Sequence, residues 1–117
     1  MKLTLNVWER MMLNIIIGGT QGTAAVMRKA FKVMSVLEMT PEEEKEAELV
    51  HQPSGDISWN AELGIHYDLE IKDKEAVNLL RRQFALHDQW KGTQAKQVGV
   101  LEAKLGLTPK ETDESPE

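Results

Sequence analysis

The segment GIHYDLEI, residues 64–71, alternates apolar and polar side chains along its length. This alternation predicts a β-strand with one buried and one solvated face, because successive side chains of an extended chain point to opposite sides. The apolar side chains are Ile65, Tyr67, Leu69 and Ile71, and the polar ones are His66, Asp68 and Glu70. We therefore expect a small antiparallel sheet in this chain.

Two other segments are candidates for strands. Residues 57–60, ISWN, precede a turn at 60–64, so we expect them to form a hairpin with residues 64–71. At the start of the chain, Leu3, Leu5 and Val7 alternate with polar residues and permit a short strand.

Much of the remaining chain has the periodicity of amphipathic helices. Asn6 followed by Glu9 predicts a capping box on a first helix that ends at Gly18 and Gly19. Its apolar stripe is expected to be Trp8, Met11, Met12, Ile15 and Ile16. Residues 12–17 also fit a buried strand, because a short apolar run has no decisive period, and the cap favours the helix.

Start signals mark the later helices. Residues 23–38 form the clearest amphipathic stretch, with Phe31 on the apolar face, and Thr40 followed by Pro41 is a specific start signal. Asp73 is expected to cap the next helix and Thr93 the last, which ends at Gly106. The inward side chains between them are predicted to be Ala76, Val77, Leu80, Phe84 and Leu86.

These elements predict an α+β fold, mostly helical, with four to five helices and a small antiparallel sheet of two or three strands. Residues 1–107 are expected to form a single globular domain. Residues 108–117 are polar and acidic, and we expect them to form a disordered tail.

Composition excludes several classes of protein. The chain has no cysteine, which excludes disulfides and thiolate metal sites. It has no apolar run of the length that predicts a transmembrane helix, and no secretory signal is evident. We therefore expect a cytoplasmic protein with no membrane partner.

Charge is distributed in blocks along the chain. The net charge is +3 for residues 1–40, −8 for 41–71, +3 for 72–107 and −3 for 108–117. The acidic middle could be neutralised within the fold, or it could pack against a basic flank of a second copy. Because phosphate contacts need a dominant basic surface, we do not expect nucleic acid as the main partner.

The glycine-rich turn within residues 15–29 is the strongest candidate for a ligand site. Glycines before a helix start can cradle a phosphate group with backbone N–H groups. The candidate residues are Gly18, Gly19, Thr20, Gly22, Thr23 and Arg28. Their spacing matches neither the dinucleotide fingerprint nor the P-loop, so a connection between two helices is favoured and a nucleotide or phosphate site is the alternative.

No arrangement of residues predicts catalysis or a metal site. His66, Asp68 and Glu70 would be neighbours on one strand face, but no second cluster with ligand spacing accompanies them, so a solvated acidic face is favoured. The glutamates within 42–48 begin a helix and are expected to be solvated. We therefore predict no enzymatic activity and no cofactor.

Arg81, Arg82 and Trp90 are candidate partner-binding residues, because arginine and tryptophan are frequent at protein interfaces. Packing in the core is the favoured interpretation for Trp90, and also for Trp8 and Trp59.

Several short motifs resemble a family of small uncharacterised proteins encoded by phages and prophages. They are LNVWER at 5–10, VLEMTPEEEKE at 36–46 and SWN at 58–60, followed by amphipathic helices. The resemblance spans most of residues 3–107 and carries over no functional residues. It implies an accessory protein in the cytoplasm of a bacterial host, or a minor component of particle assembly.

The expected function is that of a phage-type accessory protein that acts as a protein-interaction module and self-associates as a homo-oligomer. Binding of a small ligand at the turn from Gly18 to Thr23 is the alternative. Weak nucleic-acid binding is a third hypothesis.

Overall fold

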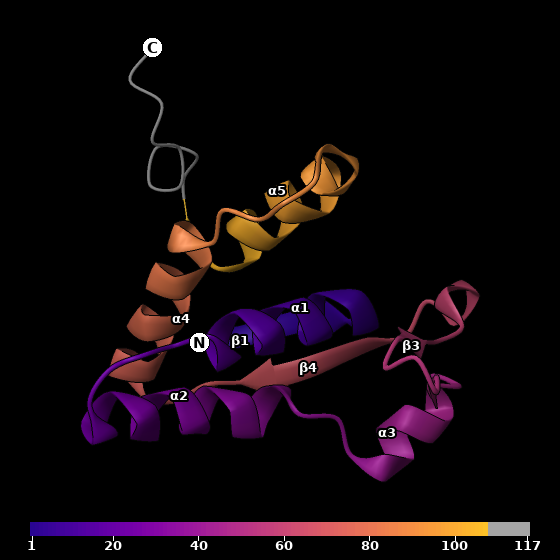
Figure 1. Ribbon diagram of the computed structural model, residues 1–117, viewed down its shortest axis with the longest axis horizontal. Helices are drawn as coiled ribbons and strands as arrows, with labels where there is room; N and C mark the ends of the chain where they lie inside the picture. Colours follow the sequence, from indigo (N-terminus) through magenta and orange to yellow (C-terminus); the bar gives the residue numbers. More distant parts are fainter. Residues whose placement is uncertain (108–117) are drawn as a thin grey trace.

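The structure is a computed structural model that describes residues 1–107, so the predicted tail lies outside the described residues. Its helices are α1 (Val7–Gly18), α2 (Ala24–Leu37), α3 (Pro41–Glu46), α4 (Lys74–Leu86) and α5 (Ala95–Lys104), and its 3-10 turns are η1 (Ala61–Leu63) and η2 (Gly92–Gln94). Its strands are β1 (Lys2–Asn6), β2 (Val50–His51), β3 (Ile57–Ser58) and β4 (His66–Glu70). The predicted mostly helical α+β fold is confirmed (Figure 1).

The predicted hairpin between 57–60 and 64–71 is wrong. β4 pairs instead with β1 in an antiparallel ribbon, and β3 pairs with β2 in a separate two-stranded sheet. The reason is the match of apolar faces. Leu3 lies directly opposite Leu69, so β1 and β4 present their apolar side chains on the same side, whereas β3 has two residues and offers no such face.

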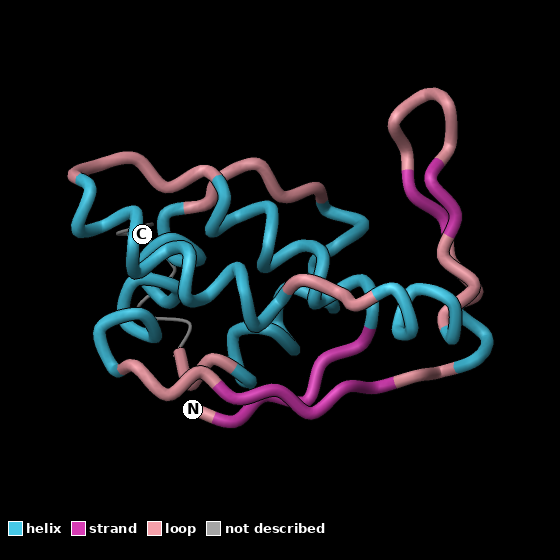
Figure 2. The backbone as a smooth tube through the Cα atoms, turned by 90° about the horizontal axis from the view of Figure 1, so that it is seen from below, coloured by secondary structure: helices cyan, strands magenta, loops and turns pink. Residues whose placement is uncertain are grey.

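The helices lie on one side of the β1–β4 ribbon, and its other side is open (Figure 2). On the covered side, α1, α2 and α4 pack against one another, and α1 and α2 also approach the strands. The main core includes Leu3, Leu5, Leu13, Ile16, Ile17, Val33, Leu37, Ile71, Val77, Leu80, Phe84, Leu101 and Leu105. The ribbon is therefore the outer layer of a two-layer fold.

The helix starts follow the predicted local signals. Asn6 and Glu9 form a capping box on α1, with N···O distances of 2.8 and 2.9 Å. The prediction that residues 12–17 are helical is confirmed. Side-chain caps also begin α2, α3 and α4, at Thr23, Thr40 and Asp73 respectively.

The last helix begins later than predicted. Thr93 lies within η2, and α5 starts at Ala95, because the Gln94 side chain accepts the Lys91 N–H at 2.8 Å and tightens the turn that precedes α5. α5 ends as predicted before Gly106, whose φ of +73° is left-handed.

Three large apolar side chains that were expected to point inward are exposed. They are Ile15 of α1, Phe31 of α2 and Leu86 of α4, with exposed fractions of 61%, 69% and 61%. The buried face of α1 instead includes Leu13 and Ile17. β1 runs directly into α1, so the ribbon sets the rotation of this helix about its axis.

Residues 41–64, which we call the acidic arm, contain α3, the β2–β3 hairpin and η1. The hairpin stands apart from the helical layer (Figure 2). A second, smaller apolar cluster attaches the arm to the body, and it consists of Val7, Ala47 and Tyr67 with Met11, Met39, Leu49, Trp59, Ile65 and Leu69 packed around them. Among residues 1–107, no helix has the length and apolar character needed to span a membrane.

Candidate functional site

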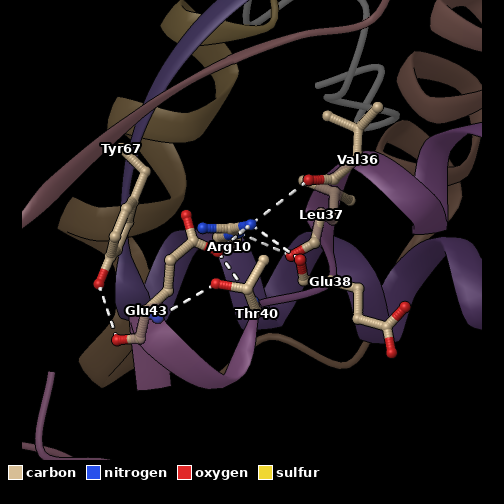
Figure 3. A network of polar contacts seen from close by, with 7 residues as sticks. All are labelled: Arg10, Val36, Leu37, Glu38, Thr40, Glu43 and Tyr67. Carbon is tan, nitrogen blue, oxygen red and sulfur yellow. Dashed lines mark hydrogen bonds and ion pairs between the residues drawn. The ribbon is translucent and has the colours of Figure 1, made fainter. Parts of the chain in front are cut away.

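The buried Arg10 side chain joins the acidic arm to the body (Figure 3). Its side chain is 3% exposed, and its Nη2 lies 3.0 Å from Glu43 Oε1 of α3. Its Nε donates to the Leu37 carbonyl at 2.7 Å, and Nη2 donates to the Glu38 carbonyl at 2.8 Å. These carbonyls lie at the end of α2 and have no N–H partner within the helix. One guanidinium therefore caps the end of α2 and also binds α3.

Tyr67 of β4 lies on the other side of this guanidinium (Figure 3). The Arg10 guanidinium carbon is 5.0 Å from the centroid of the Tyr67 ring, a cation–π distance. The Tyr67 hydroxyl donates to the Glu43 carbonyl at 3.4 Å. Arg10 therefore connects α1, the end of α2, α3 and β4.

The titration of both acidic partners reflects this network. The hydrogen bond from Arg10 lowers the pKa of the Glu43 carboxyl from its ordinary value. Burial raises the pKa of the Tyr67 phenol, and the negative charges of Glu46 and Glu43 add to this effect.

The predicted glycine turn forms the connection between α1 and α2. Gly18 is the last residue of α1, and the N–H groups of Gly19 and Thr20 donate back to the carbonyls of Ile16 and Ile17. Thr23 Oγ1 accepts the N–H of Val26 at 3.3 Å, Gly22 has a φ of +155°, and Arg28 is exposed on α2. Two of the amides that a phosphate cradle would use are thus occupied in ending α1, and ligand binding at this turn stays a prediction.

The candidate partner-binding residues Arg81, Arg82 and Trp90 have different surroundings, and their role in binding stays a prediction. Arg81 Nε donates to the Leu105 carbonyl at 2.7 Å and closes the end of α5. Arg82 is exposed. Trp90 is half-buried, and its ring centroid lies 5.7 Å from that of Phe84 and 4.5 Å from that of His87.

The acidic strand face is exposed, as the strand pattern predicts. His66, Asp68 and Glu70 are exposed on β4, and Asp68 Oδ1 accepts the Thr4 hydroxyl at 2.7 Å. Within residues 1–107, no group of three or more His, Asp or Glu side chains is arranged to hold a metal ion.

A hollow lies at one end of the ribbon. Its volume is about 450 Å³, within the range of ligand pockets. We call it the tryptophan pocket, because Trp8 of α1 and Trp59 of the arm both line it, with Val7, Ala61 and Ile65. Trp8 packs on the main core and Trp59 on the smaller cluster, so the pocket forms where the two apolar clusters meet.

The polar residues that line the pocket are held by defined hydrogen bonds. Asn6 and Asn60 are the N-caps of α1 and η1. His66 Nδ1 donates to the Gly64 carbonyl at 2.9 Å, which leaves Nε2 as the free ring nitrogen. His66 is the one titratable side chain among the residues that line the pocket.

A second hollow lies on the open face of the ribbon, on the same two strands as the tryptophan pocket. It has a volume of about 430 Å³ and is lined by Lys2, Leu3, Thr4, Asp68, Leu69 and Glu70. Asn6 and His66, which line the tryptophan pocket, are a directly opposed pair at the adjacent end of the same two strands. We call the two hollows together the ribbon groove.

Comparison of the chain with protein-family models, with curated proteins and with solved structures finds no match. The assignment of a site therefore depends on the geometry of these residues.

The sequence patterns did not reveal the ribbon groove or the Arg10 network. Both combine residues that are far apart in the chain, such as Trp8 with Trp59 and Arg10 with Tyr67. The available signal for the pocket was that the NVW and SWN motifs each place a tryptophan within two residues of an asparagine that can cap a helical turn.

Replacing Arg10 with methionine is expected to lower the free energy of unfolding by about 2–4 kcal/mol, because the α2 carbonyls and the Glu43 carboxylate lose a charged donor while the apolar stem is kept. Urea unfolding measures this. The matched control is Lys29→Met, which removes the exposed ion pair with Glu75 and should cost about 0–1 kcal/mol. Equal losses in the two variants would contradict the role given to Arg10.

The loss in free energy of unfolding caused by Arg10→Met should also become smaller at acidic pH. The lowered pKa of Glu43 means that its contribution to stability is present above its ordinary pKa of 4.5 and disappears as the pH falls through the lowered value.

Tyr67 is the single tyrosine of the chain, so tyrosinate absorbance reports it alone. In the native protein we expect its titration midpoint above the ordinary value of 10.0, and in concentrated urea a return to that value. The contribution of the protonated Tyr67 to the free energy of unfolding is fully present below pH 10.0. It declines as the pH rises through the higher native pKa. Circular dichroism at each pH verifies that the chain is still folded, and a native midpoint at or below 10.0 would contradict the buried network.

Proposed function

We propose that this protein is a non-enzymatic protein-interaction module, and that its ribbon groove binds an extended, basic segment of a partner protein. The observation that carries the proposal is the convergence of Trp8 and Trp59 in one pocket at the end of an open strand pair. Tryptophan contributes strongly at protein interfaces, so the pocket is suited to an apolar anchor side chain of the partner. The ribbon would extend the contact by about 16 Å over its five residues.

The charge around the groove supports a basic partner. Glu48 accepts the Asn60 side-chain N–H at 3.3 Å, and Glu62 follows one residue after the pocket-lining Ala61, so both lie near the rim. Asp68 and Glu70 line the second hollow. Four carboxylates therefore lie along or near the groove, against one lysine of its lining, Lys2.

The acidic block is not neutralised by lysine or arginine within the described residues. Of its nine acidic residues, only Glu43 lies within 4 Å of such a side chain, namely Arg10. Lys29 and Lys32 of the basic α2 instead pair with Glu75 and Asp73, which belong to the other basic block. The strongest negative charge of residues 1–107 is thus available to a partner.

The resemblance to phage and prophage proteins supports a setting for this activity. Two of the motifs that carry it, LNVWER and SWN, contribute Trp8 and Trp59 to the groove. The proposal therefore includes an accessory role in the cytoplasm of a bacterial host.

Selection from a random peptide library on the immobilised protein tests the groove. We expect enriched peptides to combine one aromatic or large aliphatic residue with several lysines or arginines. Binding is measured in a Trp90→Phe background, in which the two remaining tryptophans both line the pocket and report on it by fluorescence. Affinity should fall about tenfold or more in Trp59→Leu, because a buried anchor contact is worth about 2 kcal/mol.

The electrostatic part of the proposal is tested by comparing the peptide affinities of the Glu70→Lys and Asp88→Lys variants. Both make the same charge change at an exposed position, but only Glu70 lines the groove. We expect the first variant to lose affinity and the second to retain it. Equal affinities for all variants, or enriched peptides without basic residues, would refute the proposal.

The proposal also includes self-association, in which the acidic arm of one copy meets basic residues of another. Exposed Arg28 and Arg82 are available for that contact. Sedimentation velocity at low salt should show a concentration-dependent oligomer that dissociates as salt rises, because exposed charges are screened beyond about 10 Å at 0.1 M salt. A monomer at every concentration in low salt would remove self-association and leave the peptide result unaffected.

A further inference from the structure

A hollow between α2 and α4 is separate from the ribbon groove and has a different chemistry. It has a volume of about 280 Å³, and its polar lining includes Thr20, Gln21, Lys29, Asn78, Arg82 and Glu75. It shares no lining residue with the ribbon groove. We call it the α2–α4 hollow.

Hydrogen-bond donor groups outnumber negatively charged groups in this hollow. Lys29 supplies an ammonium group, Arg82 a guanidinium group, and Gln21 and Asn78 supply side-chain amides. Glu75 is the single carboxylate among the lining residues. Its Oε2 lies 3.0 Å from Lys29 Nζ, but its side chain is 69% exposed, and an ion pair so open to water is weak.

Thr20 lies at the wall of the hollow. The residue is 8% exposed, it lines the hollow, and its Oγ1 is buried without a hydrogen-bond partner among the described residues. Because less than 1 Å² of the Oγ1 surface is accessible, Thr20 forms part of the wall of the hollow and its hydroxyl does not reach a bound anion.

We propose that the α2–α4 hollow binds a phosphate-type anion, held by Arg82 and Lys29 with the side-chain amides of Gln21 and Asn78 completing the donor set. Guanidinium groups match the geometry of phosphate oxygens with paired N–H donors, which favours phosphate over a simple halide. The volume is below that of most drug-sized ligand sites, so a single phosphoryl group fits it better than a whole nucleotide. Glu75 competes with the anion for Lys29.

Titration with inorganic phosphate, followed by NMR of backbone and side-chain amides, tests this site. We expect saturable shifts at Thr20, Gln21, Asn78 and Arg82 that sodium chloride at matched ionic strength does not produce. Arg82→Gln should weaken binding about tenfold or more, because it removes a charged hydrogen bond. The matched control is Lys96→Gln, which removes an exposed positive charge of α5 that does not line the hollow and should leave the affinity unchanged.

Glu75→Gln supplies a result of opposite sign, since removing the competing carboxylate should tighten phosphate binding severalfold. Lys29→Gln should weaken it and serves in place of Arg82→Gln if that variant does not fold. A phosphomonoester such as glycerol phosphate distinguishes the free ion from an attached phosphoryl group, because tighter binding of the ester indicates the attached group. Shifts that stay linear with concentration, or equal losses in Lys96→Gln and Arg82→Gln, would overturn the site.

Discussion

The first turn of α1 holds the fold together by burying two adjacent opposite charges. The Arg10 guanidinium binds the end of α2 and forms an ion pair with α3. Glu9 accepts the Asn6 N–H and, at 2.7 Å, the Lys104 ammonium of α5. Each charge is costly to bury alone and acceptable only with these partners. One helical turn therefore positions both the acidic arm and α5. The tryptophan pocket at the start of α1 depends on both of these elements, since Trp59 comes from the arm and Gln97 from α5.

The ends of two helices are closed by arginines from elsewhere in the chain. Arg10 donates to carbonyls at the end of α2, and Arg81 donates to the Leu105 carbonyl at the end of α5. A helix leaves its last four carbonyls without helical partners, and a cation near that end is also favoured by the helix dipole. In this protein, arginines that look like surface charges in the sequence therefore have structural roles, whereas Arg28 and Arg82 are exposed.

Local signals predicted most of the elements, and long-range contacts decided the rest. The capping boxes at Asn6 and Thr40 depend on residues three positions apart, so the sequence alone was sufficient. The partner of β4 lies 64 residues away, and the burial of Arg10 depends on carbonyls 27 and 28 residues away. No periodicity encodes such pairs. For the same reason the glycine turn was visible in the sequence, whereas the ribbon groove, built from Trp8, Trp59 and His66, was not.

The pairing of β1 with β4 also sets an order of events in folding. Closing a chain of 64 residues costs about 4 kcal/mol of entropy by the logarithmic loop law, whereas capped helices form on the microsecond scale. On the ribosome, at about 5–20 residues per second, β1 would wait roughly 3–13 s for β4, with the apolar side of Leu3 and Leu5 uncovered. The ribbon is thus expected to close last, and a partner segment that binds along it would select chains whose folding is complete.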